Sequence, residues 1–435
     1  MSEQLPSLTD GVDLSPPNTA VPASGVTLDA IQRMAEASDT LIARLRNVAT
    51  ETEARRDFTA RGYTITEVAK LLNRTAEGIR KAEKAGKLEP PALRENGRRQ
   101  PYSLSQINAM RDLWNLRPGR GEGDEPIRLS FANFKGGVGK TTLSCHCAQY
   151  LARAGYRVLL IDCDSQGSAT MTFGYRPDED FTHEDTLLPY LTGEHDDIAY
   201  AVKPTHWDGL DLVPANLELY SAEYALMAEG AREGGEWLGR LDRGIRTVEG
   251  AYDVVVIDPP PALGAISLSV LRSIDGLIVP TPPAMYDFHS TSSFFSMLCE
   301  VMEQIEQSLG EPVELDFLKV VVSKHVAGRP SHDFVATLMQ EVYGNSMLKN
   351  AFVASAEIDN AASEWHTVYD LTTHTASRQT YRRCIESLDA VFGEIESLIK
   401  AIWQARRSER MLSNNVRTVA EPTKGQGAHA DLADA

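Results

Sequence analysis

The sequence predicts an α/β fold, a doubly wound and mostly parallel sheet, preceded by a long helix and a helix-turn-helix module. Short apolar runs alternate with amphipathic segments from Ile127 onward, and a glycine-rich turn follows the first run. A basic segment with two short helical patterns comes before them. With 435 residues and 42% hydrophobic content, the chain has room for two or three folding units.

The chain begins and ends with polar segments that lack a hydrophobic period. We expect residues 1–26 and 412–435 to be disordered tails. Between 27 and 58, apolar residues recur at alternating steps of three and four, at Ile31, Met34, Leu41, Leu45 and Val48, with Ser38 as the interruption. A lone helix of this length needs a partner, so we expect it to dimerise the chain. Packing against its own chain is the alternative.

Residues 59–120 predict a winged helix-turn-helix domain. Thr64 and Glu67 form a capping-box pattern before a first short helix, and Thr75 can cap a second helix that ends at Gly86. A turn at Asn96-Gly97 would make a hairpin wing. The residues expected to face inward are Val68, Leu71, Leu72, Ile79 and Ala82.

The charge of this segment indicates DNA binding. Residues 61–120 hold thirteen basic and six acidic residues, a net charge of +7, whereas the whole chain carries −18. Charge alone would equally fit a solvated face, but helix and wing together resemble the MerR-type winged helix. The candidate DNA-binding residues are Arg74, Arg80, Lys81, Lys84, Arg94, Arg98 and Arg99.

The sequence predicts neither a membrane span nor a thiol-based metal site. No window reaches about 18 unbroken apolar residues, and the polar start lacks a signal-peptide pattern, so we expect a cytoplasmic protein without membrane contact. None of the five cysteines falls in a C-x-x-C spacing, and we expect buried or inert thiols.

Residues 125–411 predict the sheet-containing domain. A last strong helix, 378–411, carries an apolar stripe that is more typical of core than of a membrane anchor. The runs expected to be buried strands lie within 127–134, 156–164, 209–216, 252–260, 275–283 and 315–325.

The stretch "FANFKGGVGKTT", 131–142, predicts a phosphate-binding loop, although Phe134 stands where the usual pattern has its first glycine. Gly136, Gly137 and Gly139 let backbone N–H groups face phosphate, and the following helix adds its positive end. Lys140 would bind the β and γ phosphates, and the Thr141 hydroxyl would bind Mg²⁺.

Three aspartates at strand ends complete the expected site. Asp258 ends the apolar strand "VVVID" and is the expected Mg²⁺ ligand through water. Asp162 and Asp164 end "VLLIDCD" and share one face because side chains alternate along a strand. The alternative for Asp162 is that it caps the strand end.

"KGGVGKTT", "LLIDCDSQGSAT", "VVVIDPPPALG" and "LIVPTPPAMYDFHS" resemble the deviant Walker P-loop ATPases of the ParA family. The long helix and winged helix resemble its larger subclass, which includes RepA-type plasmid partition proteins. Ser165 stands where relatives place proline, and we expect the turn to form regardless.

The resemblance implies an ATP-dependent sandwich dimer with Mg²⁺, in which Lys135 reaches the phosphates bound by the other subunit. It implies that Lys135, Lys140 and Asp164 are catalytic, with Asp164 orienting water, and that Thr141, Asp162 and Asp258 hold the metal. It implies that nucleotide is bound by Lys135, Gly136, Gly137, Val138, Gly139, Lys140, Thr141, Thr142, Pro282 and Asp287, with Pro282 and Asp287 beside the adenine.

Relatives also bind DNA without sequence preference, and Arg378, Arg382 and Arg383 share much of one face at the start of the last helix. A solvated helix terminus is the alternative for these three residues.

The resemblance therefore predicts a weak, nucleoid-associated plasmid or chromosome partition ATPase, stimulated by DNA and a ParB-like centromere-binding protein, that represses its own operon. A nucleotide-switched transcriptional repressor is the main alternative. A MinD-like membrane-cycling ATPase lacks its amphipathic anchor here, and a metabolic P-loop ligase would leave the basic module unexplained.

Overall fold

The computed structural model describes residues 28, 31–38, 40–41, 61–310, 312–371 and 377–420. The chain divides into two compact units, 1–59 and 60–435. The described residues of the first unit are helical, as expected for the dimerisation helix. The rest of that prediction, the tail at 1–26 and the end of the tail after Ala420 lie outside the described residues.

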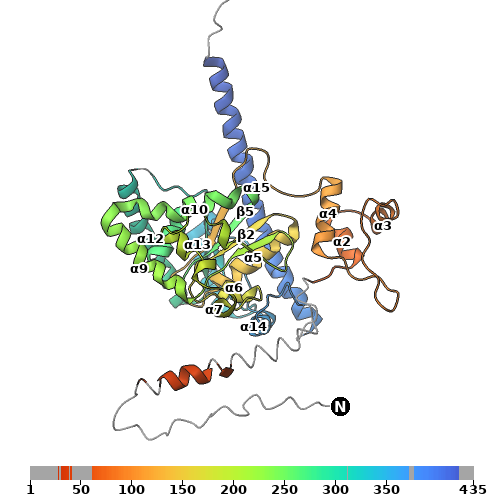
Figure 1. Cartoon of the computed structure of the whole chain (residues 1–435), viewed down its shortest axis with the longest axis horizontal. Helices are drawn as coiled ribbons and strands as arrows, with labels where there is room; N and C mark the ends of the chain where they lie inside the picture. The colour runs from red at the N-terminus through yellow and green to blue at the C-terminus, as the bar shows by residue number, and fades with distance from the viewer. Residues whose placement is uncertain are drawn as a thin grey trace, which may run out of the picture. The chain divides into compact units, whose positions relative to one another are not determined.

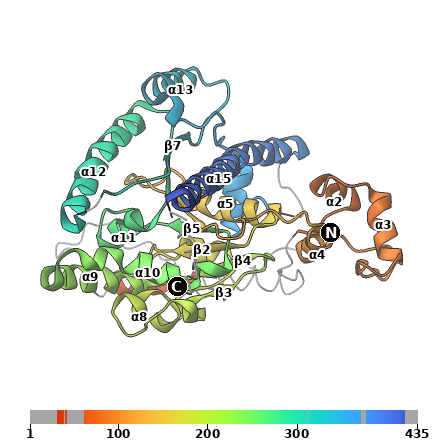
Figure 2. The same cartoon turned by 90° about the horizontal axis from the view of Figure 1, so that it is seen from above.

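The second unit is built on a seven-stranded sheet in the order β3-β4-β2-β5-β1-β6-β7. Figure 2 labels β2, β3, β4, β5 and β7 of this sheet. Neighbouring strands are parallel except β3, which is antiparallel to β4. The six predicted strands are confirmed, whereas the two-residue β3 was not expected. The strands are β1 (Ile127–Phe131), β2 (Val158–Asp162), β3 (Lys203–Pro204), β4 (Leu210–Val213), β5 (Val254–Asp258), β6 (Gly276–Thr281) and β7 (Phe317–Val322).

Helices cover both faces of this sheet, as Figure 1 shows. They are α5 (Lys140–Ala154), α6 (Ser168–Thr172), α7 (Pro177–Asp180), α8 (Leu188–Leu191), α9 (Tyr220–Glu233), α10 (Arg240–Val248), α11 (Ala265–Ser273), α12 (Met285–Leu309), α13 (Pro330–Tyr343), α14 (Ala356–Ser363) and α15 (Arg378–Ala420). Short 3-10 turns are η1 (His183–Asp185), η2 (Ala199–Ala201), η3 (Leu217–Leu219), η4 (Gly234–Gly239), η5 (Glu249–Ala251) and η6 (Gly344–Ser346).

Alternating side chains of the strands divide the core into two layers. Leu160 of β2 packs in the layer that holds α5 and α15, whereas Leu159 and Ile161 pack in the layer that holds α9 to α13. Strands β1, β2, β5 and β6 are buried at every residue, which explains their near-continuous apolar runs. Helix α15 continues beyond the expected Met411 to Ala420, so the predicted tail begins too early.

Residues 61–114 hold three helices, α2 (Ile65–Leu71), α3 (Ala76–Lys84) and α4 (Leu104–Trp114). The Thr64–Glu67 capping box and the Thr75 cap are present as predicted. Asn73 adopts a left-handed conformation, with φ of 49°, in the turn between α2 and α3. Val68 and Leu72 are buried as predicted, whereas Leu71 is exposed because the chain turns directly after it, which corrects its predicted inward position.

The hairpin and helix α4 complete this N-terminal module. The Arg94 N–H donates to the Arg98 carbonyl at 2.7 Å across the predicted Asn96-Gly97 turn. Leu93 and Arg99 form an isolated antiparallel β-bridge. Helix α4 was not expected, although Ser103 and Gln106 form a capping box at its start. That pattern was the available signal for the helix.

Helix α4 joins the module to the sheet-containing part of the unit. Asn108 Nδ2 donates to Asp208 Oδ2 at 2.6 Å, and Arg111 Nη2 donates to the Arg153 carbonyl near the end of α5 at 2.6 Å. Burial lowers the pKa of Arg111 to about 10. The module therefore contacts the same helix, α5, that follows the glycine-rich loop.

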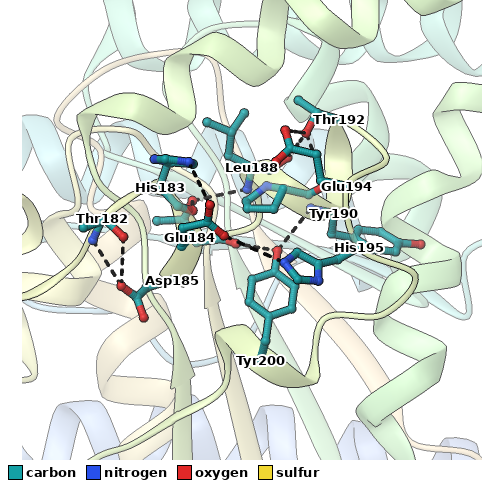
Figure 3. A network of polar contacts seen from close by, with 12 residues as sticks. Thr182, His183, Glu184, Asp185, Leu188, Tyr190, Thr192, Glu194, His195 and Tyr200 are labelled. Carbon is teal, nitrogen blue, oxygen red and sulfur yellow. Dashed lines mark hydrogen bonds and ion pairs between the residues drawn. The ribbon is translucent and has the colours of Figure 1, made fainter.

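A network of polar contacts stabilises the irregular segment between α7 and β3, residues 181–202 (Figure 3). The Tyr200 hydroxyl donates to the Thr186 carbonyl at 2.8 Å and accepts from the Tyr190 N–H at 3.1 Å. The His195 ring stacks on Tyr200 with centroids 4.2 Å apart. These contacts satisfy the backbone of an irregular segment and fix it beside the edge of the sheet.

Four cysteines, Cys145, Cys147, Cys163 and Cys384, are buried as expected, but Cys299 is exposed on α12. The expectation was of buried or inert thiols, so the exposure of Cys299, on an outward-facing part of α12, corrects only the expectation of burial. Among the described residues, no group of three or more His, Cys, Asp or Glu side chains could hold a metal ion by itself. None of the described helices is long and apolar enough to cross a membrane.

Close packing at the start of β6 requires a glycine at position 276, and this can be tested. A Cβ added at Gly276 would lie 2.1 Å from ring atoms of Phe317, its partner on β7. Because both residues are buried, we expect Gly276→Ala to destabilise the protein by about 1–3 kcal/mol. Thermal unfolding measures the loss. In a Phe317→Leu background the same substitution should cost less, and an equal cost in both backgrounds would contradict the clash.

Candidate nucleotide-binding site

The loop after β1 has the conformation of an anion-binding turn. Gly137 and Gly139 have φ of 72° and 100°, which other residues rarely adopt, and α5 begins directly after them at Lys140. A Cβ added at Gly136 or Gly137 would meet no atom within 4 Å, so this side of the loop is open. Open backbone and a helix N-terminus together favour a bound phosphate.

Lys140 lies inside the loop. Its side chain is buried, and Nζ donates to the Lys135 carbonyl at 3.4 Å. Burial lowers the pKa of Lys140, while the charges of Asp258 and Asp164 oppose that shift. The ammonium group is thus held between the loop backbone and two carboxylates.

Asp258 presents a buried carboxylate to the start of α5. Ser144 Oγ donates to its Oδ1 at 2.9 Å, and Oδ2 is buried without a hydrogen-bond partner among the residues that the structure describes. Burial raises the pKa of Asp258, and the Thr141 and Ser144 hydroxyls offset part of the shift. An orphaned carboxylate oxygen beside a threonine hydroxyl fits a Mg²⁺ site.

Asp162 is aligned with Asp258 on the neighbouring strand, but its carboxylate accepts hydrogen bonds from residues of the following turn and helix α6. Its Oδ2 accepts from the N–H and hydroxyl of Thr170, at 2.9 and 2.8 Å, and its Oδ1 accepts from the Asp164 N–H at 3.1 Å. Burial and the Asp258 charge raise its pKa. With both oxygens engaged, Asp162 fits the capping alternative better than the metal-binding role.

Asp164 lies at the turn that follows β2 and is half-buried. Its Oδ1 accepts from the Gln166 N–H at 3.1 Å, and burial raises its pKa against the opposing effect of Lys140. The Gly167 N–H donates to the Asp164 carbonyl at 2.8 Å, so the turn forms with Ser165 in place of proline, as expected.

Lys135 points toward α12. Its Nζ forms an ion pair with Asp287 Oδ1 at 2.6 Å, which the sequence did not predict. Asn133 Oδ1 accepts from the Lys135 N–H at 3.0 Å, and the Phe134 ring contacts Phe294 with centroids 4.7 Å apart. Phe134 thus gives the loop a hydrophobic anchor where the usual pattern has a glycine.

The other predicted nucleotide-binding residues lie around the same edge of the sheet. Val138 is buried and Thr142 is half-buried at the start of α5. Pro282 is half-buried just after β6, and its carbonyl accepts from the Ala284 N–H at 2.9 Å. The structure therefore places Pro282 just before α12 and Asp287 in its first turn, while their contact with adenine remains a prediction.

The candidate DNA-binding residues are exposed, but three of them have partners. Arg99 Nη1 pairs with Glu83 Oε2 of α3 at 2.5 Å, which ties the hairpin to that helix. Arg74 lies over the Trp114 ring at 5.4 Å, and Arg382 pairs with Glu386 at 2.8 Å. The remaining members are Arg80, Lys81, Lys84, Arg94, Arg98, Arg378 and Arg383.

Comparison with known proteins assigns the chain to a family. Residues 128–310 match the family model described as "AAA domain". The chain is 36% identical to "Protein SopA" of Escherichia coli (strain K12) over 80% of its own length and 90% of the relative's. The chain belongs to the ParA family of partition ATPases. The match with SopA is longer than residues 125–435, so it extends into the N-terminal part.

Other comparisons agree with the ParA family. The chain is 31% identical to "Putative replication protein A" of Sinorhizobium fredii, covering 79% of this chain and 87% of the relative. A solved structure named "Partition Protein" superposes with a TM-score of 0.61 at 22% identity, over 82% of this chain and 98% of the other, and shows the shared fold.

The contacts of Asp162 and Asp164 predict different effects of substitution. Asp162→Asn would turn an NH₂ group or a single acceptor toward three buried donors, so we expect a stability loss of about 1–3 kcal/mol. Asp164→Asn retains an acceptor for Gln166 and should lower the melting temperature far less. Differential scanning calorimetry compares the two, and equal losses would contradict the capping role of Asp162.

Proposed function

We propose that this chain is a DNA-partition ATPase in which two protomers enclose ATP between them. The observation that carries the proposal is the pair of lysines on one loop. Lys140 is buried beside Asp258 and Asp164, whereas Lys135 is partly exposed and directed away from them. Membership of the ParA family supports ATP as the ligand.

Within one protomer, the loop and three side chains would hold ATP with Mg²⁺. The backbone of 136–139 would bind phosphate oxygens and Lys140 would neutralise their charge. Thr141 and Asp258 would hold Mg²⁺, with the free Oδ2 of Asp258 as the acceptor. When bound, Mg²⁺ neutralises charge on the phosphate oxygens.

Asp164 would orient the attacking water. It lies close enough to Lys140 for the two charges to interact, and burial raises its pKa, which suits a group that accepts a hydrogen bond from water. One carboxylate oxygen is held by the turn at Gln166, so the group is fixed in place.

Lys135 would complete the site of the second protomer. A cation that binds the neighbour's triphosphate makes the nucleotide part of the interface, and hydrolysis then removes charge that both lysines hold. The lifetime of the dimer is thereby tied to the nucleotide. The helix at 27–58 would join the same two chains independently of ATP.

DNA would be bound at two places. The exposed cations of α3 and the hairpin suit an operator, with α3 in the groove and the hairpin on phosphate. Arg378, Arg382 and Arg383 at the start of α15 suit sequence-independent phosphate contact, for which Arg382 would exchange its exposed ion pair with Glu386 for a DNA phosphate. A ParB-like centromere-binding protein would stimulate hydrolysis, and the protein would act in the cytoplasm on the nucleoid.

The second candidate function is a nucleotide-switched repressor of its own operon. The contact between α4 and α5 favours it, because Arg111 of the N-terminal module donates to the Arg153 carbonyl of the helix that begins at the nucleotide loop. A shift of α5 on nucleotide binding would therefore reach the module. Both functions can reside in one chain.

The two lysines should separate binding from dimer closure. Lys140→Ala should abolish binding of a fluorescent ATP analogue, because a buried positive charge beside phosphate is lost. Lys135→Ala should keep analogue binding but lose the ATP-dependent rise in sedimentation coefficient that compaction of the joined chains on closure would produce. Both are measured at matched Mg²⁺ and analogue concentrations. If ATP raises the sedimentation coefficient of Lys135→Ala as much as that of the unmodified protein, the cross-subunit role is excluded.

Segregation and pure repression differ in what stimulates hydrolysis. We expect ATP turnover by the full chain to rise most when DNA and the product of the adjacent downstream gene are both present, because a partner completes a slow site. Phosphate release measures turnover, with Lys140→Ala as the inactive control. No stimulation by the pair would favour the repressor.

The two DNA surfaces should respond differently to salt. Arg382→Glu with Arg383→Glu should weaken binding of the ATP-bound protein to unrelated duplex DNA and lower the salt slope by about two. Arg94→Glu with Arg98→Glu is the matched control and should instead weaken footprinting on the chain's own upstream DNA. An unchanged salt slope in the α15 variant would remove that helix from the DNA site.

A further inference from the structure

Three consecutive loop residues contact one face of α12. Asn133 Nδ2 donates to Thr291 Oγ1 at 3.2 Å, Phe134 packs its ring against Phe294, and Lys135 forms its ion pair with Asp287. Positions 287, 291 and 294 are spaced by four and three residues, which places them on a single face of the helix. The entry to the nucleotide loop is therefore attached to the first three turns of α12.

The ion pair differs from the other two contacts in its exposure. Thr291 and Phe294 are buried, whereas the Lys135 side chain is 36% exposed and that of Asp287 17%. Asn133 also donates to the Pro280 carbonyl at 3.0 Å, which keeps the backbone before Lys135 in place. The contact that can exchange partners most readily is thus the one between Lys135 and Asp287.

We propose that Asp287 is a positioning residue that holds Lys135 on its own subunit until the triphosphate of a second copy displaces it. This inference rests on the proposed cross-subunit role of Lys135, because the 2.6 Å contact with Asp287 directs the ammonium group toward α12 of its own protomer. Closure of the dimer then requires the ion pair to break and frees the first turn of α12.

The exchange makes closure sensitive to the charge of the nucleotide. Asp287 offers a single negative charge, whereas a triphosphate offers several in a cluster. The triphosphate therefore outcompetes the Asp287 carboxylate for the Lys135 ammonium group. A diphosphate offers fewer and competes less well. Asp287 therefore opposes closure with either nucleotide, and a triphosphate overcomes this competition more fully than a diphosphate.

Release of a bound fluorescent ATPγS analogue measures closure, because a nucleotide enclosed by two protomers leaves slowly whether or not the chains are also joined elsewhere. In the full chain with Mg²⁺, we expect Asp287→Asn to slow release about two- to fivefold, the range for losing a partly exposed competing ion pair. The corresponding ADP analogue should also be released more slowly. Asp287→Glu keeps the charge and should stay near the unmodified protein.

Two controls separate the ion pair from other effects. Glu300→Gln removes the same charge from an exposed position on α12 and should leave release unchanged. In a Lys135→Ala background, Asp287→Asn should have no effect, since the carboxylate acts through the lysine. The melting temperature of each variant without nucleotide identifies any loss of folding.

The outcomes distinguish this inference from the proposed function. If Lys135→Ala fails to hasten release, the cross-subunit role itself is wrong. If Lys135→Ala hastens release but Asp287→Asn leaves it unchanged or hastens it, only the positioning role is overturned. An effect of Asp287→Asn that persists without Lys135 would show direct contact with nucleotide and would also overturn it. If Asp287→Asn does not fold, Asp287→Ser takes its place.

Discussion

The parallel alignment of β2, β5 and β1 is the constraint on which the candidate site depends. Asp162 of β2 lies level with Asp258 of β5, and β1 pairs with β5 on its other side. Because parallel strands end at the same edge, the loop after β1 and the two aspartates meet there. The buried residues on both faces of these strands fix the alignment, since a shift by one residue would turn aspartate into the core.

Asp162, Asp164 and Asp258 all follow or end a buried strand, but their surroundings give them different roles. Asp162 is surrounded by N–H and hydroxyl donors and holds a turn, and Asp164 is half-buried next to Lys140. One buried oxygen of Asp258 has no hydrogen-bond partner within the described part of the chain. The pKa of each is raised by burial, and Asp162 has both carboxylate oxygens engaged by protein donors. Asp162 therefore supports the backbone, whereas Asp258 and Asp164 are the carboxylates proposed to act on the nucleotide.

Much of the fold followed from the sequence because its signals are local. Buried strands read as apolar runs, and Thr64, Thr75 and the last helix follow capping and periodicity rules. Helix α4 was missed although its capping box was present, and the exposure of Leu71 and Cys299 depends on neighbouring elements. The Lys135–Asp287 ion pair joins residues 152 positions apart, and no local pattern indicates such a contact.

The exposure of Cys299 gives this protein a built-in chemical handle on α12. The other four thiols are buried, and Cys299 stands at a groove that Phe295 and Tyr343 also line. A thiol-reactive dye would therefore attach at one place without any engineered cysteine. Since the same helix begins at the ion pair with the loop, its fluorescence would follow movements of α12 in the unaltered chain.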